Sequence, residues 1–212
     1  MNNTVDYFWI WFIVNHKKLQ DLRKLKPKEQ KHFTFWLNWH LHFYAPGIDY
    51  ILIFPHRQEK HTQMIITANG NPEYFRKVEE VVAAAPQLRD WKFTAFVQPS
   101  HDYEELEKGL DKPYVFQDIT LKVSDLKFVP FEYEGEKKMD MIVYLKNYTV
   151  YSHDKNLLQL IYFMMQDLLG EKSLYENINF VELAQLPEEN ENELICLYDL
   201  QFYIDEINKD HK

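Results

Sequence analysis

Residues 48–72 read IDYILIFP-HRQEKH-TQMIITA-NGNP, which is two short apolar runs separated by a polar stretch and followed by a turn. Short runs that are rich in Ile, Leu and Phe and joined by polar residues are typical of a β-hairpin. In the turn, Asn71 is suited to the N-cap of a helix and Pro72 to its first turn. We therefore expect a hairpin, then a helix that Pro86 ends, then a strand over 91–97.

The same order of elements returns in the second half of the chain. The segments that show it are two strands, a helix and a third strand, at 119–133, 139–145, 155–169 and 178–183, with a break expected near Ser124-Asp125 in the first of them. Hairpin–helix–strand thus occurs twice, at about 48–97 and 126–183. We interpret this as an ancient duplication or as two similar units side by side. The alternative is coincidence among elements that are common in α+β proteins.

Further helices are expected outside these two units. Residues 27–44 begin with a first-turn proline and place apolar side chains on one helical face. Residues 7–14 and 200–208 are also predicted to be helical. The predicted fold class is α+β: mixed or antiparallel sheet packed by helices, with extra helices at the N- and C-terminal ends.

The domain prediction is a single compact domain over 1–212. The alternative is two lobes, 1–99 and 116–212, joined by the loop 100–115. The polar stretch 98–118, with a short helix near 103–108, is the one plausible linker. A long polar loop inside a compact domain is often either a lid or a connector.

Two segments are apolar on nearly every side. Residues 156–169 leave almost no polar face, so this helix is predicted to be the central core helix or part of a subunit interface. Residues 7–14 must likewise be covered, by the rest of the fold or by a second subunit. A homodimer is therefore one of the expected possibilities.

Composition bounds the partners. The net charge is -9, which disfavours nucleic acid as a partner and allows a basic protein partner. Aromatic residues make up 16% of the chain, which allows a large core. The basic segment 16–31 is interpreted as a solvated helix face and turn. The run 7–14 is too short for a signal peptide or a membrane span, so we expect a cytoplasmic protein with no membrane partner. Its one cysteine, Cys196, is expected in the core.

Familiar site motifs are absent. All five glycines fall at predicted turns or helix ends, so no phosphate-binding loop and no cofactor are expected. His32 and His40 lie ~12 Å apart along one helix and cannot share a zinc ion, and no metal site is expected. Ser100-His101-Asp102 is not a catalytic triad, because adjacent side chains diverge.

Two weak candidates remain. Asn69, Gly70 and Asn71 precede a helix N-terminus and could contact an anion, although a turn and cap is the favoured interpretation, because Pro72 removes one donor and Glu73 adds a negative charge. Asp140 lies between two methionines in a strand, and alternation places it on the opposite face from them. If that face is covered, we expect a raised pKa for Asp140.

One resemblance bears on the first half of the chain. The segments Phe8-Trp-x-Trp-Phe12, Ile65-Ile-Thr-Ala-Asn-Gly-Asn71 and Trp91-Lys-Phe-Thr-Ala-Phe96 resemble a group of bacterial proteins of similar length, mainly over 1–100. No activity is established for that group. The resemblance implies a bacterial, stand-alone protein and transfers no site residue.

The sequence thus favours a non-enzymatic cytoplasmic protein that binds or regulates a protein partner. One form of this hypothesis is an immunity-type protein that neutralises a basic toxin. A small enzyme with a site under the 98–118 segment and a structural homodimer are the alternatives.

Overall fold

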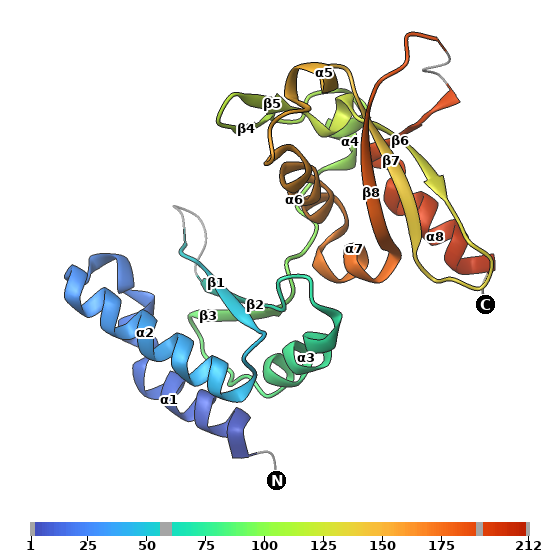
Figure 1. The fold of residues 1–212 in the computed structure, drawn as a ribbon. Helices are drawn as coiled ribbons and strands as arrows, with labels where there is room; N and C mark the ends of the chain where they lie inside the picture. Colours follow the sequence, from blue (N-terminus) through green and yellow to red (C-terminus); the bar gives the residue numbers. More distant parts are fainter. Residues whose placement is uncertain (1–2, 56–60, 190–192, 211–212) are drawn as a thin grey trace. The chain divides into compact units, whose positions relative to one another are not determined.

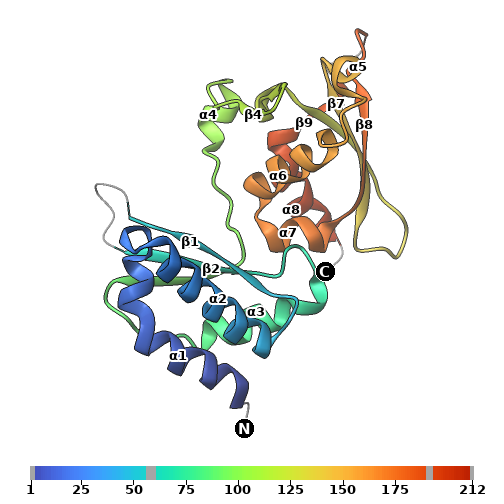
Figure 2. The ribbon, with the colours of Figure 1, turned by 60° about the vertical axis from the view of Figure 1, so that its left-hand side comes forward.

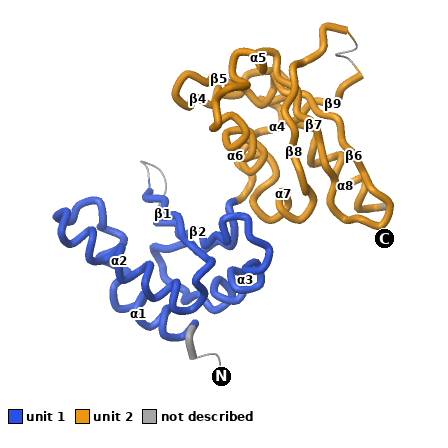
Figure 3. Tube along the Cα trace, in the orientation of Figure 1, with its two compact units in different colours: residues 1–97 blue, residues 98–212 orange. Residues whose placement is uncertain are grey.

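A computed structural model describes residues 3–55, 61–189 and 193–210 of the chain. The chain divides into two compact units, residues 1–97 and 98–212 (Figure 3). Each unit is described by itself. The two-unit division falls at the start of the polar stretch 98–118, whose residues belong to the second unit.

The first unit is a three-stranded sheet with helices (Figure 1). In chain order its elements are α1 (Asn3–Gln20), η1 (Leu22–Lys24), α2 (Pro27–Tyr44), β1 (Asp49–Ile53), β2 (Thr62–Thr67), η2 (Pro72–Tyr74), α3 (Phe75–Ala83) and β3 (Trp91–Ala95). The strand order is β1-β2-β3, with β1 antiparallel and β3 parallel to β2. The predicted hairpin, helix and strand of this half are therefore present.

The core of the first unit is built from rings. Phe8 and Phe12 of α1 are fully buried, and Phe12 contacts Trp91 and Phe93 of β3 edge to face. The Trp9 indole N–H donates to the Val81 carbonyl at 2.9 Å and ties α1 to α3. Such aromatic pairs add to the free energy of area burial. Residues 7–14 are thus helical, as part of α1, and the face of α1 that carries Phe8 and Phe12 is buried.

The second unit has a larger sheet and more helices. Before the sheet come α4 (Tyr103–Glu107), β4 (Tyr114–Phe116), β5 (Ile119–Leu121) and η3 (Val123–Asp125). The sheet and its helices follow as β6 (Lys127–Phe131), β7 (Met139–Leu145), α5 (Tyr148–Tyr151), α6 (Leu157–Leu169), α7 (Glu171–Asn177), β8 (Ile178–Gln185), β9 (Ile195–Cys196), η5 (Leu197–Asp199) and α8 (Leu200–Asp210). The strand order is β8-β7-β6-β9, and β4 and β5 form a separate pair.

The two units share one pattern of strand pairing. In each, a hairpin pairs antiparallel, and a strand that follows a helical crossover pairs parallel to the hairpin's second strand. The α+β class, with mixed sheet packed by helices and with helices at both ends, is confirmed. Duplication as the origin of the shared pattern stays a prediction.

Helix α6 is the centre of the second unit's core (Figure 2). Its buried side chains pack with those of β7, whose residues alternate between buried and half-buried. The buried residues of α6 are Leu157, Leu160, Ile161, Met164, Met165, Leu168 and Leu169. The core interpretation of this helix is correct for that face, while Leu158 and Phe163 are exposed.

Several element boundaries follow the predictions closely. The helix over 27–44 and the strand over 139–145 have the predicted bounds. The expected break near Ser124–Asp125 is the short 3-10 helix η3. Among the described residues, none of the helices has both the length and the apolar character needed to cross a membrane.

Candidate functional site

The segment 98–118 supplies the residues that line a hollow in the second unit. Helix α4 begins after Asp102, because the Asp102 carboxylate accepts the Glu104 amide at 2.9 Å. The chain turns after the helix at Gly109, which adopts a φ of 65°. Leu106 of α4 is buried in the core. We call this depression the α4 hollow. It is lined by one basic and three acidic residues together with four others: Ser100, His101, Asp102, Glu105, Asp111, Lys112, Pro113 and Tyr114. Its volume is about 310 Å³.

A chain of hydrogen bonds runs behind the hollow and joins three segments. The Tyr114 hydroxyl donates to Asp167 Oδ2 at 2.6 Å and lies 2.8 Å from His101 Nε2. The Ser100 amide donates to the Asp167 carbonyl at 2.8 Å. Asp167 belongs to the core helix α6, so these bonds attach the 98–118 segment to the rigid part of the unit.

The hydroxyl proton of Tyr114 fixes the direction of this chain. Because that proton goes to Asp167, the His101 Nε2 atom must be the donor to the phenol oxygen. Burial, followed by the Asp167 hydrogen bond, raises the pKa of Tyr114 well above its ordinary value. Tyr114 is therefore a neutral phenol at physiological pH, a hydrogen-bonding group and not a base. The alternative of an enzyme with a site under 98–118 stays a prediction.

Asp111 is the buried member of the hollow's lining. The residue is 4% exposed, and its Oδ2 accepts the Ser124 amide over a long 3.4 Å. Within the described part of the chain, its Oδ1 is buried without a hydrogen-bond partner. A buried carboxylate oxygen without a donor costs free energy, so natural proteins seldom keep one without a reason.

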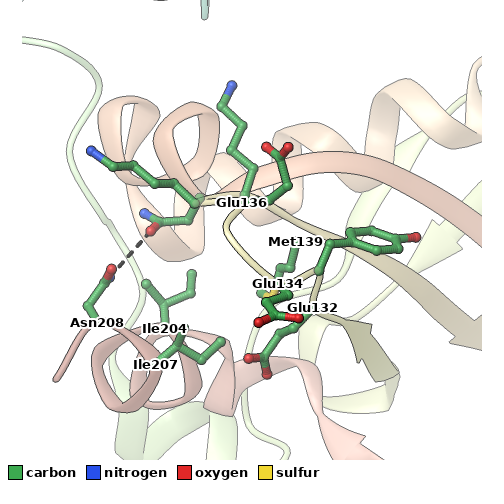
Figure 4. A pocket seen from close by; sticks show the side chains of 11 residues that line it. Glu132, Glu134, Glu136, Met139, Ile204, Ile207 and Asn208 are labelled. Atoms are coloured by element: carbon green, nitrogen blue, oxygen red, sulfur yellow. Dashed lines mark hydrogen bonds between the residues drawn. The ribbon is translucent and has the colours of Figure 1, made fainter. Parts of the chain in front are cut away.

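A second depression lies between the β6–β7 hairpin and α8 (Figure 4). It measures about 140 Å³. Its apolar side is formed by Met139, Ile204 and Ile207, and in Figure 4 Glu132 and Glu134 lie next to Met139. On one side of it the Asn208 side-chain Nδ2 donates to the side-chain Oδ1 of Asn177 at 3.3 Å.

The charges of this second depression are mixed. Three glutamates and two lysines line it: Glu132, Glu134, Glu136, Lys137 and Lys138. The Tyr203 hydroxyl donates to Glu132 beside it, and burial together with that bond raises the pKa of Tyr203 to about 12. This depression is smaller than the α4 hollow, and its acidic and basic residues nearly balance. It therefore offers fewer features that could select a ligand.

The predicted anion contact forms a local turn. Asn69 and Gly70 adopt φ angles of 50° and 76°, and the Asn69 amide donates to Thr67 Oγ1 at 2.9 Å. Asn71 Oδ1 accepts the Glu73 amide at 3.1 Å and so caps the 3-10 helix η2, as the sequence suggests. An anion contact at these three residues stays a prediction.

Asp140 lies at the surface of the sheet. Its side chain is on the face opposite Met139 and Met141, and it accepts hydrogen bonds from Tyr133 at 3.0 Å and Asn179 at 2.8 Å. On that face Tyr133 and Phe180 are 52% and 54% exposed. The structure does not bring Asp140 to the α4 hollow, and its predicted perturbation stays a prediction.

Cys196 differs from the expectation of a core residue. It is only half-buried, because it lies in the edge strand β9, and the Lys127 ammonium donates to its sulfur at 3.2 Å. Tyr198 also bonds it, and that contact is the main reason why the pKa of Tyr198 is raised.

Sequence reasoning missed the residues that build the α4 hollow. Along the sequence His101 stands between Ser100 and Asp102, whereas its partner Tyr114 is 13 residues away and Asp167, which Tyr114 bonds, is 66 residues away. The one signal was Asp167 itself, a carboxylate in an otherwise apolar helix. Asp111 carries no signal, because it is one of several carboxylates in the stretch 98–118.

The described residues contain no group of three or more His, Cys, Asp or Glu that could hold a metal ion. Comparison of the chain with family models, curated proteins and solved structures found no match. By its fold, the chain is an α+β protein in which two units share a hairpin–helix–strand order.

Proposed function

We propose that this protein is a non-enzymatic binding protein whose second unit docks a basic protein partner. The observation behind the proposal is the uneven distribution of charge. Of the chain's 24 basic and 33 acidic residues, 13 and 9 lie in residues 1–97, whereas 11 and 24 lie in residues 98–212. A unit with such an excess of carboxylates attracts basic surfaces and accelerates their association.

The α4 surface is where this charge meets exposed aromatic rings. Glu104 and Glu107 are exposed on α4, beside Asp102 and Glu105 of the hollow. The rings of Tyr103 and Phe202 are exposed and meet edge to face, with their centroids 5.0 Å apart. Carboxylates next to aromatic faces recognise arginine and lysine side chains through ion pairs and cation–π contacts.

One concrete form of the proposal is an immunity-type protein of the bacterial cytoplasm that neutralises a basic toxin. The acidic surface would cover the toxin's cationic face. This form differs from general binding in requiring a single tight partner instead of weak association with many basic proteins.

Charge reversal on α4 tests the proposal. We expect wild-type protein to retain basic proteins from a lysate at low salt and to release them as salt is raised. The double variant Glu104→Lys/Glu107→Lys should lose them at low salt. The control Glu182→Lys/Glu206→Lys makes the same change in charge at exposed positions on β8 and α8 of the same unit.

The control should keep most of the binding, because local charges at an interface act more strongly than net charge. Failure to retain any basic protein at low salt would contradict the proposal. Equal loss in both double variants would show that net charge alone acts, and would remove α4 as the docking surface.

A second candidate function is a homodimer formed through the first unit. The observation that favours it is the outer face of α1, where Tyr7, Ile10 and Val14 are exposed at helical spacing. Phe35, Trp39 and Phe43 repeat this pattern on α2. Monomeric proteins seldom expose apolar faces of this size.

A further inference from the structure

The α4 hollow contains a carboxylate that the fold leaves in need of a donor. Asp111 is almost wholly buried, and its Oδ1 has no partner within the described residues. Nearby, Lys122 donates to the Gly109 carbonyl at 2.7 Å, on the same loop as Asp111. The missing donor is the first of two features that define the ligand.

The second feature is the rest of the lining. Asp102 and Glu105 add two exposed carboxylates and Lys112 adds one exposed ammonium, so that, with Asp111, three acidic side chains face a single basic one. The ring centroids of His101 and Tyr114 are 5.9 Å apart. Tyr114 is held by Asp167, so its ring is fixed in place before a ligand arrives. A volume of about 310 Å³ accommodates a long side chain or a small molecule.

These features match a guanidinium group better than an ammonium. A guanidinium is planar, presents five N–H donors in a fixed fork and stacks on aromatic rings. It can pair with Asp111 while its other donors reach Asp102 or Glu105. A lysine ammonium is a strongly hydrated point charge and would lose more hydration on entry.

We propose that the α4 hollow binds a guanidinium group, presented by an arginine side chain of the partner protein, with Asp111 as its buried acceptor. This inference rests on the proposed function for the identity of the partner. The same chemistry could come from a free guanidinium compound, and the experiment distinguishes the two sources.

Asp111→Asn is the decisive variant. Asparagine keeps an oxygen for the Ser124 amide but removes the charge. We expect it to bind Nα-acetyl-arginine amide at least about tenfold more weakly than wild type, because a hydrogen-bonded ion pair is lost. Its melting temperature should be unchanged or higher, because a buried unpaired charge is removed from the free protein.

Two further variants guard the result against misfolding. Glu105→Gln changes an exposed lining residue and should also weaken binding of the arginine probe. Glu206→Gln makes the same chemical change on the exposed side of α8 and should leave binding unchanged. Binding is measured by titration calorimetry on the full chain, with Nα-acetyl-lysine amide as the matched probe and an arginine-containing tripeptide as the larger one.

The outcomes separate the inference from the proposed function. A lowered melting temperature in Asp111→Asn with unchanged arginine binding means that Asp111 is structural and overturns the inference. Equal affinity for the arginine and lysine probes, or binding of calcium or magnesium in their place, also overturns it. If the arginine probe does not bind while α4 charge reversal still abolishes capture, only the inference fails.

The opposite combination of results also distinguishes the inference from the proposed function. If the arginine probe binds but no basic protein is retained at low salt, the hollow binds a free guanidinium compound, and the proposed function fails. Tighter binding of the tripeptide than of the single amino-acid amide supports a protein side chain as the natural ligand.

Discussion

At the residue scale, Glu80 shows how neighbouring donors set the properties of one side chain. Its carboxylate accepts hydrogen bonds from Tyr44 at 2.9 Å, Arg76 at 3.0 Å and Lys77 at 2.9 Å. The Lys77 bond, followed by the Tyr44 bond, lowers the pKa of Glu80 to about 2. The group of donors joins the end of α2 to α3.

This arrangement predicts a dependence of stability on pH. Because the pKa of Glu80 is lower in the folded chain than its ordinary 4.5, its contribution is complete above about pH 4.5. It is lost as the pH falls from there through about 2. We expect Glu80→Gln to be less stable than wild type at pH 7, with the difference shrinking towards pH 2.

Urea unfolding at a series of pH values measures this difference. Glu73→Gln is the matched control, since Glu73 is exposed at the start of the same helical region. A difference between wild type and Glu80→Gln that stays constant from pH 7 to pH 2.5 would contradict the assigned cause.

At the scale of elements, α6 shows that an apolar helix can have two unlike faces. Ile161 is fully buried, and Phe163, two residues further on, is 51% exposed. Both residues are apolar, so a pattern of apolar and polar positions does not distinguish them. Only Ile161 packs in the core of the second unit. The two residues therefore allow a matched comparison on one helix.

We expect Ile161→Ala to lower the free energy of unfolding by about 2–5 kcal/mol, through lost burial and the cavity left behind. Phe163→Ala should change it by about 0.5 kcal/mol or less, because an exposed side chain loses little burial. Chemical denaturation of both variants provides the measurement. A large loss in Phe163→Ala would mean that its ring is covered in solution.

At the scale of the whole molecule, the exposed outer faces of α1 and α2 raise the question of assembly. Ile10 and Val14 are 59% and 78% exposed, and α1 packs against α2 through the stacked rings of Trp11 and His40, whose centroids are 5.0 Å apart. A stable interface buries roughly 800 Å² from each partner, to which several half-exposed rings contribute substantially.

If this face is a dimer interface, wild-type protein should sediment as a dimer at micromolar concentrations. The variant Ile10→Glu/Val14→Glu should sediment as a monomer, because it would bury two unpaired charges in each copy's contact. Val150→Glu is the control, since Val150 is 72% exposed in the other unit. A monomeric wild type across that range would eliminate the homodimer.

The charge difference between the units also belongs to this scale. It can be counted from the sequence once the boundary is known, but the boundary at residues 97 and 98 comes from the structure. Residues 100–115 fall in the second unit by this boundary and contain α4 and the start of β4.

Local patterns in the sequence were enough to determine most elements and the fold class. Helix 27–44, strand 139–145, the break at 124–125 and the Asn71 cap depend on periodicity and on bonds between near neighbours. Such interactions span a few residues, so the residues concerned are visible together in the sequence.

Only the tertiary structure decided the site. His101, Tyr114 and Asp167 meet because α6 packs beside the segment 98–118, and Asp111 is buried in a lining whose other charged residues are exposed. Which face of α1 or α6 stays exposed was also undetermined by composition, since both faces are apolar. Contacts between distant residues depend on how whole elements pack, and no local pattern records that packing.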